Sequence, residues 1–339
     1  MKIKINYELD TIYETMGLLY VTYNPDFLNR EVFLKEALEI GLNEASIVAL
    51  YEKMKPLLEQ YITAFQEQMV KSEVNLFYFK TDEELEQSLI FRIFVIVTLN
   101  NRHWLETLDS IDDSIIYEAM VRDLLGEVPK TTQELISKLK MEKYSPQVCW
   151  NLLLILESPK SYLEQWIQMI QSHIPACEYA QEVLEDTITS LLTNFKQPSS
   201  VLLELVESFV GEELQVWPSL IWSMSFNLLR EDLAYSGLLM GEVAKILDRK
   251  HNPEQVAQGF KVLGDQSKLE ILKFLKEGPK YNVEIANKLG VTAATTSHHM
   301  NVLVTHGFVK LLKQGNKVYY SLEEERITEA IADLKSILL

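Results

Sequence analysis

The sequence predicts a mainly α-helical protein, with a large helical N-terminal domain and a smaller C-terminal domain in which helices precede a β-hairpin. Three observations predict this fold class. Glycine and proline are scarce, at 12 and 10 of 339 residues, which disfavours loop-rich sheet proteins. Apolar residues make up 47% of the chain, which is enough for globular folding. They recur at helical spacing, and the length suits about two or three domains with separate cores.

The N-terminal domain is predicted to be a run of helices with a short two-stranded β element. Residues 2–9 alternate with period two, which predicts a strand, and the β-rich segment 74–79 is its predicted partner. Thr131 followed by Glu134 is typical of a helix start. The predicted helices span residues 30–40, 44–69, 82–98, 114–125, 131–140, 162–172, 176–195, 199–209 and 218–229. Prolines are expected to separate these segments, at Pro129, Pro146, Pro159, Pro175, Pro198 and Pro218.

A polar stretch that ends in an Asn-Pro step marks the predicted boundary, so the two domains are assigned to residues 1–250 and 253–339. The net charge of −17 is unevenly divided between them. Residues 260–322 contain nine lysines and four acidic residues, a local balance of +5, whereas residues 1–252 contain 21 basic and 39 acidic residues. A basic segment in an otherwise acidic chain indicates that this segment binds the phosphate groups of a nucleic acid.

Two short helices joined by a tight turn are the central feature of the C-terminal domain. Asn282 is expected to cap a helix over residues 283–289, and Gly290 to end it. Thr292 is expected to cap the next helix, over residues 293–306. This arrangement predicts a helix-turn-helix, preceded by helices over residues 253–263 and 266–276.

A β-hairpin and an amphipathic helix follow the helix-turn-helix. The β-rich runs 308–312 and 317–322 flank a Gly-Asn turn, which predicts a hairpin, or wing, with lysines near its tip. The last predicted helix, residues 323–339, carries one apolar stripe, formed by Ile327, Ile331, Leu334 and Leu338.

The second helix of the pair has the features of a DNA-recognition helix. Thr296, Met300 and Leu303 fall in one narrow arc and are expected to face the core. The opposite face is small and polar, as a helix that enters the DNA major groove requires. The predicted DNA-contacting residues are Thr292, Ala294, Thr295, Ser297, His298, Asn301, Lys313, Asn316 and Lys317. Base edges are assigned to Thr295, Ser297, His298 and Asn301, and phosphates to Thr292, Lys313 and Lys317.

These segments carry a resemblance to a known family. Residues 295–303 (TTSHHMNVL), followed by HGFV at 306–309 and GNKVYYSL at 315–322, resemble the ArsR-type winged helix-turn-helix regulators. The family's Ser-x-His-Leu pattern appears here as SHHM, with Met300 in place of Leu. The resemblance covers about a quarter of the chain and implies a homodimer joined by the first and last helices of this domain. The implied interface residues are Val256, Phe260, Ile327, Ile331, Leu334 and Leu338.

The resemblance does not extend to the family's metal sites. The positions that hold thiolates in its metal sensors are Tyr281 and Val283 here, and the last helix contains no His or Cys. The angular spread of His298, His299 and His306 disfavours a shared metal, and His299 is expected to be packed. No metal and no cofactor are therefore expected.

Bulk features argue against other classes of protein. Cys149 and Cys177 form neither a disulfide framework nor a metal pattern, which favours a reducing, cytoplasmic location. The most apolar run, residues 89–99, contains Arg92 and is shorter than the roughly 20 residues of a membrane span. The sequence has no Gly-rich phosphate loop, no His-Glu-x-x-His and no nucleophile elbow, so nothing in it indicates an enzyme.

Candidate sites in the N-terminal domain are weaker. The predicted helix 218–229 carries a small polar residue at every fourth position, at Ser219, Ser223 and Asn227. These residues either allow a neighbouring helix to pack closely or line a small-molecule pocket. The segment 100–104 (NNRHW) is a candidate loop site. Arg92 is expected to form an ion pair rather than bind a ligand. Trp150, Trp166, Trp217 and Trp222 are expected to be core or interface residues.

The sequence thus supports two hypotheses. The first is a cytoplasmic, homodimeric regulator of transcription that binds double-stranded DNA, acts as a repressor by family analogy, and is modulated by a small molecule or protein partner through residues 1–250. The second is an enzyme or ligand carrier to which an autoregulatory winged helix is attached. A deep pocket with converging ionisable groups would favour the second hypothesis.

The assigned roles predict different effects for two alanine substitutions. We expect Lys317→Ala to weaken binding to all sequences and to lower the salt dependence by about one counterion, because this lysine is assigned to phosphate. We expect His298→Ala to alter sequence preference, by about 1–3 kcal/mol at one base pair. Titration of both variants against preferred and random duplexes measures the difference. Identical effects on both duplexes would show that the roles are wrongly assigned.

Overall fold

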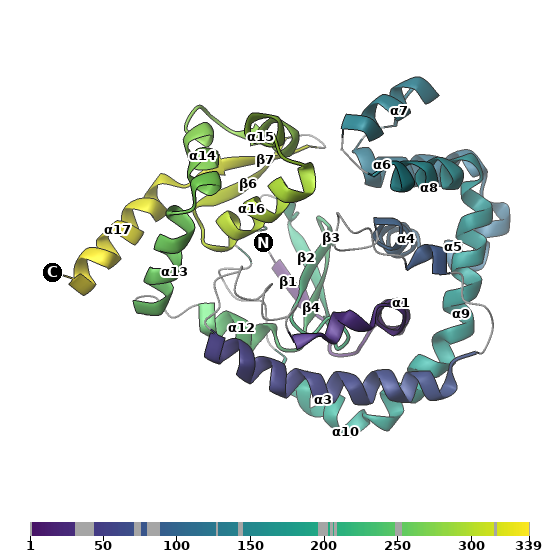
Figure 1. Ribbon diagram of the computed structural model, residues 1–339. Helices are drawn as coiled ribbons and strands as arrows, with labels where there is room; N and C mark the ends of the chain where they lie inside the picture. The colour runs from purple at the N-terminus through teal and green to yellow at the C-terminus, as the bar shows by residue number, and fades with distance from the viewer. Residues whose placement is uncertain are drawn as a thin grey trace. The chain divides into compact units, whose positions relative to one another are not determined.

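The chain forms two compact units in the computed structural model (Figure 1). The first unit comprises Met1–Phe27, Lys55–Gln197 and Glu212–Leu238, and the second comprises Leu28–Met54, Pro198–Gly211 and Leu239–Leu339. The structure describes residues 2–30, 44–70, 76–79, 89–126, 128–141, 145–195, 203, 206, 209–247, 253–314 and 317–338. The predicted C-terminal domain lies entirely within the second unit.

The first unit contains a four-stranded sheet with the strand order β1-β2-β4-β3. Its strands are β1 (Lys2–Ile5), β2 (Glu213–Ser219), β3 (Phe226–Arg230) and β4 (Leu233–Gly237). β2 is parallel to both β1 and β4, and β3 is antiparallel to β4. The predicted two-stranded element is therefore wrong. Residues 76–78 form a 3₁₀ turn instead of a strand. The partner of β1 is β2, which lies more than 200 residues further along the chain. In β2 the side chains of Leu214 and Val216 are buried on one face of the sheet.

The predicted helix over residues 218–229 is also wrong. Pro218 lies in β2, beyond the last residue of that strand that pairs with β1, and a tight turn then leads into β3. Ser223 Oγ donates to the Leu220 carbonyl, and Asn227 Nδ2 donates to Ser225 Oγ at 2.9 Å. These polar side chains hold the turn, so neither close helix packing nor a pocket explains their spacing.

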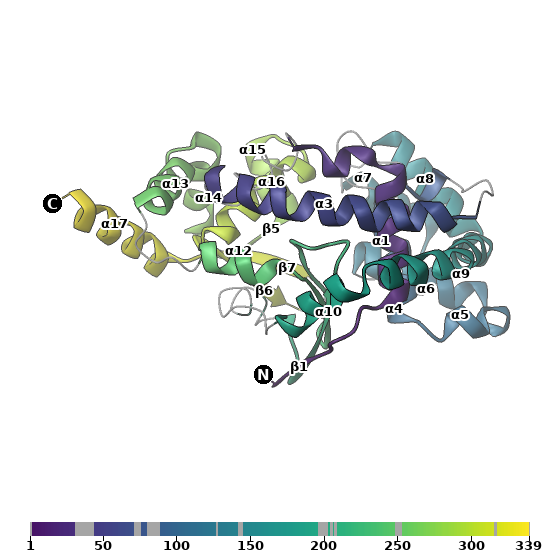
Figure 2. The same cartoon turned by 90° about the horizontal axis from the view of Figure 1, so that it is seen from below.

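The helices of the first unit lie mostly to one side of this sheet, as Figure 2 shows from below. They are α1 (Thr11–Tyr23), the greater part of α3 (Glu44–Gln68), α4 (Leu89–Asn100), α5 (Trp104–Thr107), α6 (Asp113–Leu125), α7 (Thr132–Met141), α8 (Pro146–Glu157), α9 (Pro159–Val183) and α10 (Glu185–Thr193). α1 packs against α9 and α4, and α4 packs against α6. The predictions missed α1 because it is buried on nearly all sides and has no polar stripe.

Several predicted helices are confirmed where the structure describes them. These are 44–69, the described part of 82–98, 114–125 and 131–140. Thr131 caps α7 as predicted, since its Oγ1 accepts from the Glu134 N–H at 3.1 Å. Segment 30–40 and most of 199–209 lie outside the described residues. Pro175 does not separate two helices but lies inside α9, whose neighbouring Ala176 and Cys177 are buried.

Aromatic packing anchors the helices of the first unit. Trp166 in α9 is fully buried, and its Nε1 donates to Thr98 Oγ1 at 2.9 Å. Its ring centroid lies 5.4 Å from that of Tyr78 and 5.5 Å from that of Phe94. The core role predicted for Trp166 is confirmed, whereas Trp150 is 59% exposed on α8.

The candidate loop site at residues 100–104 makes a tertiary contact. The Arg102 guanidinium pairs with the buried carboxylate of Asp10, the N-cap residue of α1, and donates to Tyr235 Oη at 2.6 Å. Tyr235 also donates to Asp10, and its ring stacks on that of Tyr13, with the centroids 3.8 Å apart. These contacts tie α1 to β4 and to the loop after α4.

A second buried carboxylate, Glu14, holds the turn after β2. Its Oε1 accepts from Ser219 Oγ at 2.6 Å and the Leu220 N–H at 3.1 Å, and its Oε2 accepts from the Ile221 N–H at 3.0 Å. Burial raises the pKa of Glu14 to about 7, although these hydrogen bonds oppose the rise. Gly17 allows α1 to approach the turn closely, because a side chain there would clash with Ile221.

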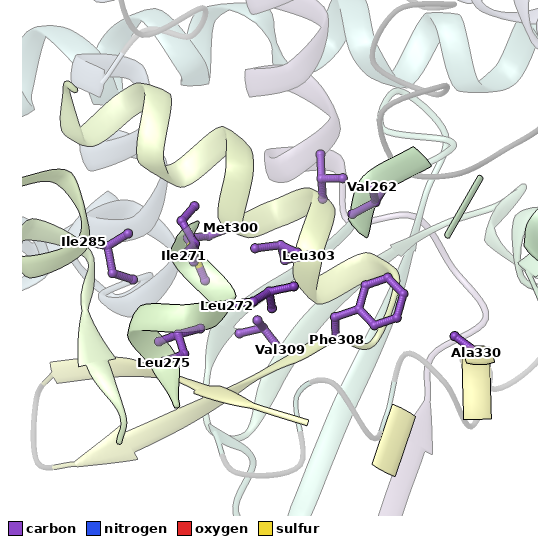
Figure 3. Close-up of a cluster of buried hydrophobic side chains, with 11 residues drawn as sticks. Val262, Ile271, Leu272, Leu275, Ile285, Met300, Leu303, Phe308, Val309 and Ala330 are labelled. Carbon is purple, nitrogen blue, oxygen red and sulfur yellow. The ribbon is translucent and has the colours of Figure 1, made fainter. Parts of the chain in front are cut away.

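The second unit contains α12 (Met240–Leu247) and all elements of the C-terminal domain. These are α13 (Pro253–Leu263), α14 (Gln266–Leu275), β5 (Lys280–Tyr281), α15 (Asn282–Leu289), α16 (Ala293–Thr305), β6 (Val309–Gln314), β7 (Lys317–Leu322) and α17 (Glu324–Leu338). One hydrophobic core joins them (Figure 3). Its most deeply buried members include Ile271 from α14, Ile285 from α15, and Met300 and Leu303 from α16.

The burial of Glu14 predicts how stability depends on pH. Because the pKa is raised from 4.5 to about 7 on folding, Glu14 favours the folded state below pH 4.5, and this contribution is lost as the pH rises through 7. The loss is on the order of 3 kcal/mol. We expect Glu14→Gln to reduce the difference in urea midpoint between pH 5 and pH 8. Ser219→Ala, which keeps the carboxyl group, is the control, and an unchanged difference in the Gln variant would refute the prediction.

Candidate nucleic-acid interface

The turn between α15 and α16 depends on Gly290. This residue has φ of +70°, a left-handed conformation that glycine adopts without strain, and its N–H donates to the Ala286 carbonyl. The Val291 N–H donates to the same carbonyl at 3.1 Å. The turn therefore closes α15 and reaches Thr292 in two residues, as the sequence predicted.

Thr292 begins α16 as its N-cap. Its Oγ1 accepts from the Thr295 N–H at 3.1 Å and lies 2.9 Å from Thr295 Oγ1. The Thr292 carbonyl accepts from the Thr296 N–H at 3.0 Å. The predicted cap is confirmed, and the exposed hydroxyls of Thr292 and Thr295 lie together at the end of the helix where backbone N–H groups favour an anion.

The buried face of α16 matches the helical projection. Thr296, Met300 and Leu303 are all fully buried. Thr296 Oγ1 donates to the Thr292 carbonyl at 3.0 Å, which satisfies its hydroxyl in the core. Figure 3 shows Met300 and Leu303 directed from α16 toward Ile271 and Leu272 of α14. This packing fixes which face of α16 remains toward solvent.

The outer face of α16 is polar, but its members are not equally exposed. Thr295 and Asn301 are exposed, whereas Ser297 and His298 are half-buried. Ser297 Oγ accepts a hydrogen bond from Asn282 Nδ2 at 3.0 Å, which ties it to the start of α15. The side chain of Ala294 lies outside the described residues.

The role predicted for Asn282 as helix cap is wrong. Tyr281 is the N-cap residue of α15, and its N–H donates to Glu284 Oε2 at 2.7 Å. Glu284 satisfies this backbone group because it occupies the third helical position, from which a carboxylate reaches back to the cap. Asn282 is the first helical residue and directs its amide to Ser297 instead.

The wing is a three-stranded sheet with the order β5-β7-β6. β6 and β7 are antiparallel with Gln314 opposite Lys317 and Lys313 opposite Val318, so the predicted hairpin is confirmed. β5 adds a short strand that pairs Tyr281 with Tyr319. Asn316 lies outside the described residues, as do the side chains of Lys313 and Lys317.

The acidic residues of the basic segment are bound locally. Asp265 pairs with Lys268 at 3.6 Å, and Glu270 pairs with Lys273 at 3.0 Å. Glu277 lies 3.7 Å from Lys280, and Glu284 accepts the backbone hydrogen bond described above. Every acid between residues 260 and 322 has a local partner, and the segment keeps a net surplus of five lysines over acids.

His299 in the middle of α16 and His306 just after the helix are both partly buried. Burial lowers the pKa of His299, which is half-buried against Lys268 and Asp265. Burial also lowers the pKa of His306 to about 4, and its ring stacks on that of Phe308. Both are therefore neutral near pH 7. The packing predicted for His299 is confirmed, although its Nδ1 has no hydrogen-bond partner among the described residues.

The predicted dimer residues fall into two groups. α13 packs against α17 within one chain, where Val256, Phe260 and Ile327 are half-buried. Further along α17, Ile331 is 56% exposed and Leu338 is 69% exposed. Leu334 is half-buried. The distal part of the apolar stripe thus remains at the surface of a single chain.

The donor set does not fit a soft metal. Tyr281 and Val283 stand where thiolates would be needed, and the N–H of Tyr281 is bound by Glu284. Among the described residues there is no group of three His, Cys, Asp or Glu side chains that could hold a metal ion.

Together, the capped helix pair, the shared core and the wing define a winged helix-turn-helix domain, the class of fold that places a recognition helix in the DNA major groove. The family model described as bacterial regulatory protein, arsR family, matches residues 265–310. The chain belongs to this family and is a DNA-binding regulator of transcription.

Relatives match the same part of the chain. A cadmium resistance transcriptional regulatory protein CadC homolog of Staphylococcus aureus is 37% identical over 83 residues, which are 24% of this chain and 69% of the relative. An arsenical resistance operon repressor of the same organism is 35% identical over 78 residues, 23% of this chain and 75% of the relative. The HTH-type transcriptional regulator MJ1325 of Methanocaldococcus jannaschii is 38% identical over 79 residues, 23% of this chain and 89% of the relative. No solved structure matches the chain.

Sequence reasoning missed the bond between Asn282 and Ser297, because residues 15 apart show no periodic signal. It also missed that Tyr281 links the helix pair to the wing through β5. In the part of the chain that the structure describes, no helix combines the length and apolar composition needed to cross a membrane.

The cap of α16 yields a test with a matched control. We expect Thr292→Ala to lower the free energy of unfolding by about 1 kcal/mol, because the Thr295 N–H loses its acceptor. Thr292→Ser keeps that acceptor and should retain most of the stability. Urea unfolding of the full chain, followed by circular dichroism, compares the three proteins. Equal losses for Ala and Ser would assign the effect to the methyl group and contradict the capping role.

Proposed function

We propose that the protein is a homodimeric repressor that binds an inverted-repeat DNA operator and is modulated through residues 1–250. The observation that carries this proposal is the division of α16 into a buried face and a small polar outer face beside a wing. A helix held in this way can enter a major groove without large side chains that would block it.

The residues divide into those that contact bases and those that hold the backbone. Thr295, Ser297, His298 and Asn301 contact base edges from the outer face of α16, and Ala294 lies among them in the sequence. Phosphates bind at the N-terminus of the helix and at the wing. The phosphate contacts are Thr292, Lys313, Asn316 and Lys317.

The dimer forms through the terminal helices of the domain. Ile331 and Leu338 expose apolar surface that a second α17 would cover, and this surface continues from the α13–α17 contact within each chain. Val256, Phe260, Ile327 and Leu334 support the interface from this contact. Two-fold symmetry would then present two recognition helices to two half-sites.

The effector acts through the N-terminal region rather than through a metal site in the winged helix. The relatives named above include a cadmium resistance regulator and an arsenical resistance repressor, but Tyr281 and Val283 supply no soft ligand. The spacing of the two recognition helices would differ between two conformations of the dimer. A ligand or protein partner that binds one conformation more tightly than the other would change the DNA affinity, at most by the ratio of its affinities for the two conformations.

Several features of the first unit support a regulatory rather than a catalytic role. Its buried carboxylates, Asp10 and Glu14, are bound by protein donors. The Cys177 thiol is buried beside Tyr61 and Gln181, and burial raises its pKa to about 12, so it is not a reactive thiolate.

Selection of bound DNA from a random duplex library, followed by a salt titration, tests the proposal. We expect an inverted repeat with half-sites about 10–11 base pairs apart and a steep loss of affinity with salt. Ile331→Glu is the control, because a charge in the dimer surface should abolish the preference for two half-sites over one. Weak binding at low salt without any preferred sequence would contradict the proposal.

A further inference from the structure

The hydrogen bond between Asn282 and Ser297 links the two helices of the DNA-binding motif at a functional position. Asn282 Nδ2 donates to Ser297 Oγ over 3.0 Å, and both residues are half-buried where α15 packs against α16. Ser297 lies at the edge of the outer face of α16, next to exposed Asn301 and on the side that faces α15. The bond therefore acts on a side chain that the proposed function assigns to a base edge.

Asn282 is held in place from two sides. The preceding residue, Tyr281, pairs with Tyr319 in the wing sheet. The Tyr281 N–H is also bound by Glu284 at 2.7 Å, which fixes the first turn of α15. The backbone next to Asn282 is thus held both by the wing sheet and by the first turn of α15, which limits where the side-chain amide of Asn282 can lie.

Ser297 differs from two other hydroxyl residues of α16, Thr296 and Thr305. Thr296 and Thr305 donate their hydroxyl protons to the helix carbonyls of Thr292 and Asn301, at 3.0 and 2.8 Å. Ser297 instead uses a lone pair to accept from Asn282. A serine hydroxyl has one proton and two lone pairs, so this bond leaves the O–H to donate elsewhere.

We propose that Asn282 is a positioning residue that makes Ser297 a hydrogen-bond donor toward DNA and so sets base preference at one operator position. In the major groove the acceptors are guanine N7 and O6, adenine N7 and thymine O4, whereas cytosine presents a donor. Ser297 therefore selects against cytosine at the base it contacts. This inference rests on the proposed function, since it needs α16 to lie in the major groove.

The substitution Asn282→Asp tests the proposal in the full-length chain, because it keeps the shape and replaces the amide donor with an acceptor. The Ser297 O–H would then donate to Asp, and a lone pair would face the DNA. We expect the wild type to disfavour cytosine at one position and Asn282→Asp to shift preference toward cytosine there by about three- to tenfold. Asn282→Ala should flatten preference at that position alone. Ser297→Ala identifies the position.

Base preference is measured by selection from a duplex library, and folding by circular dichroism. The added charge of Asp weakens binding to every sequence, so an equal loss for all duplexes with unchanged preference would overturn the proposal. It would also be overturned if Ser297→Ala altered one position while both Asn282 variants kept the wild-type preference there. By contrast, a wild type without any preferred sequence would refute the proposed function itself.

Discussion

The burial of one face of α16 constrains everything else in the DNA-binding domain. Met300 and Leu303 are fully buried against α14, and Thr296 joins them by satisfying its hydroxyl on the helix backbone. Rotation of the helix about its axis would expose these residues, at a cost of about 2–3 kcal/mol for each large apolar side chain. The polar face is consequently held outward, and the turn at Gly290 and the cap at Thr292 set where the helix begins.

Two buried carboxylates of the first unit add directed polar contacts to its apolar and aromatic core. Glu14 and Asp10 lie one turn apart on α1, and each carboxylate joins this helix to distant segments of the chain. Buried charges are costly unless they are bound, and here each is bound by two or more donors. Such contacts are specific in direction, so they fix the position of α1 against the sheet more closely than apolar packing would.

The family match and the proposed mode of control concern different parts of the chain. The matched residues cover the winged helix and leave about three quarters of the chain outside the relatives. In the resemblance to the ArsR-type metal sensors, the positions of the metal-binding thiolates correspond to Tyr281 and Val283 here. Tyr281 instead serves the architecture, as the N-cap of α15 and a member of the wing sheet. A position available for sensing in a metal regulator is here part of the scaffold that holds the recognition helix.

The sequence by itself determined the winged helix-turn-helix, because its signals are local: a cap at Thr292, a glycine turn at Gly290, a 3.6-residue period through Met300 and Leu303, and a hairpin within 14 residues. Only the tertiary structure decided the sheet of the first unit, where β1 pairs with β2 more than 200 residues away. The same holds for the bond from Asn282 to Ser297. Hydrogen bonds between remote segments leave no periodic trace, since any segment with a matching donor or acceptor could form them, and only the packed chain selects the partner.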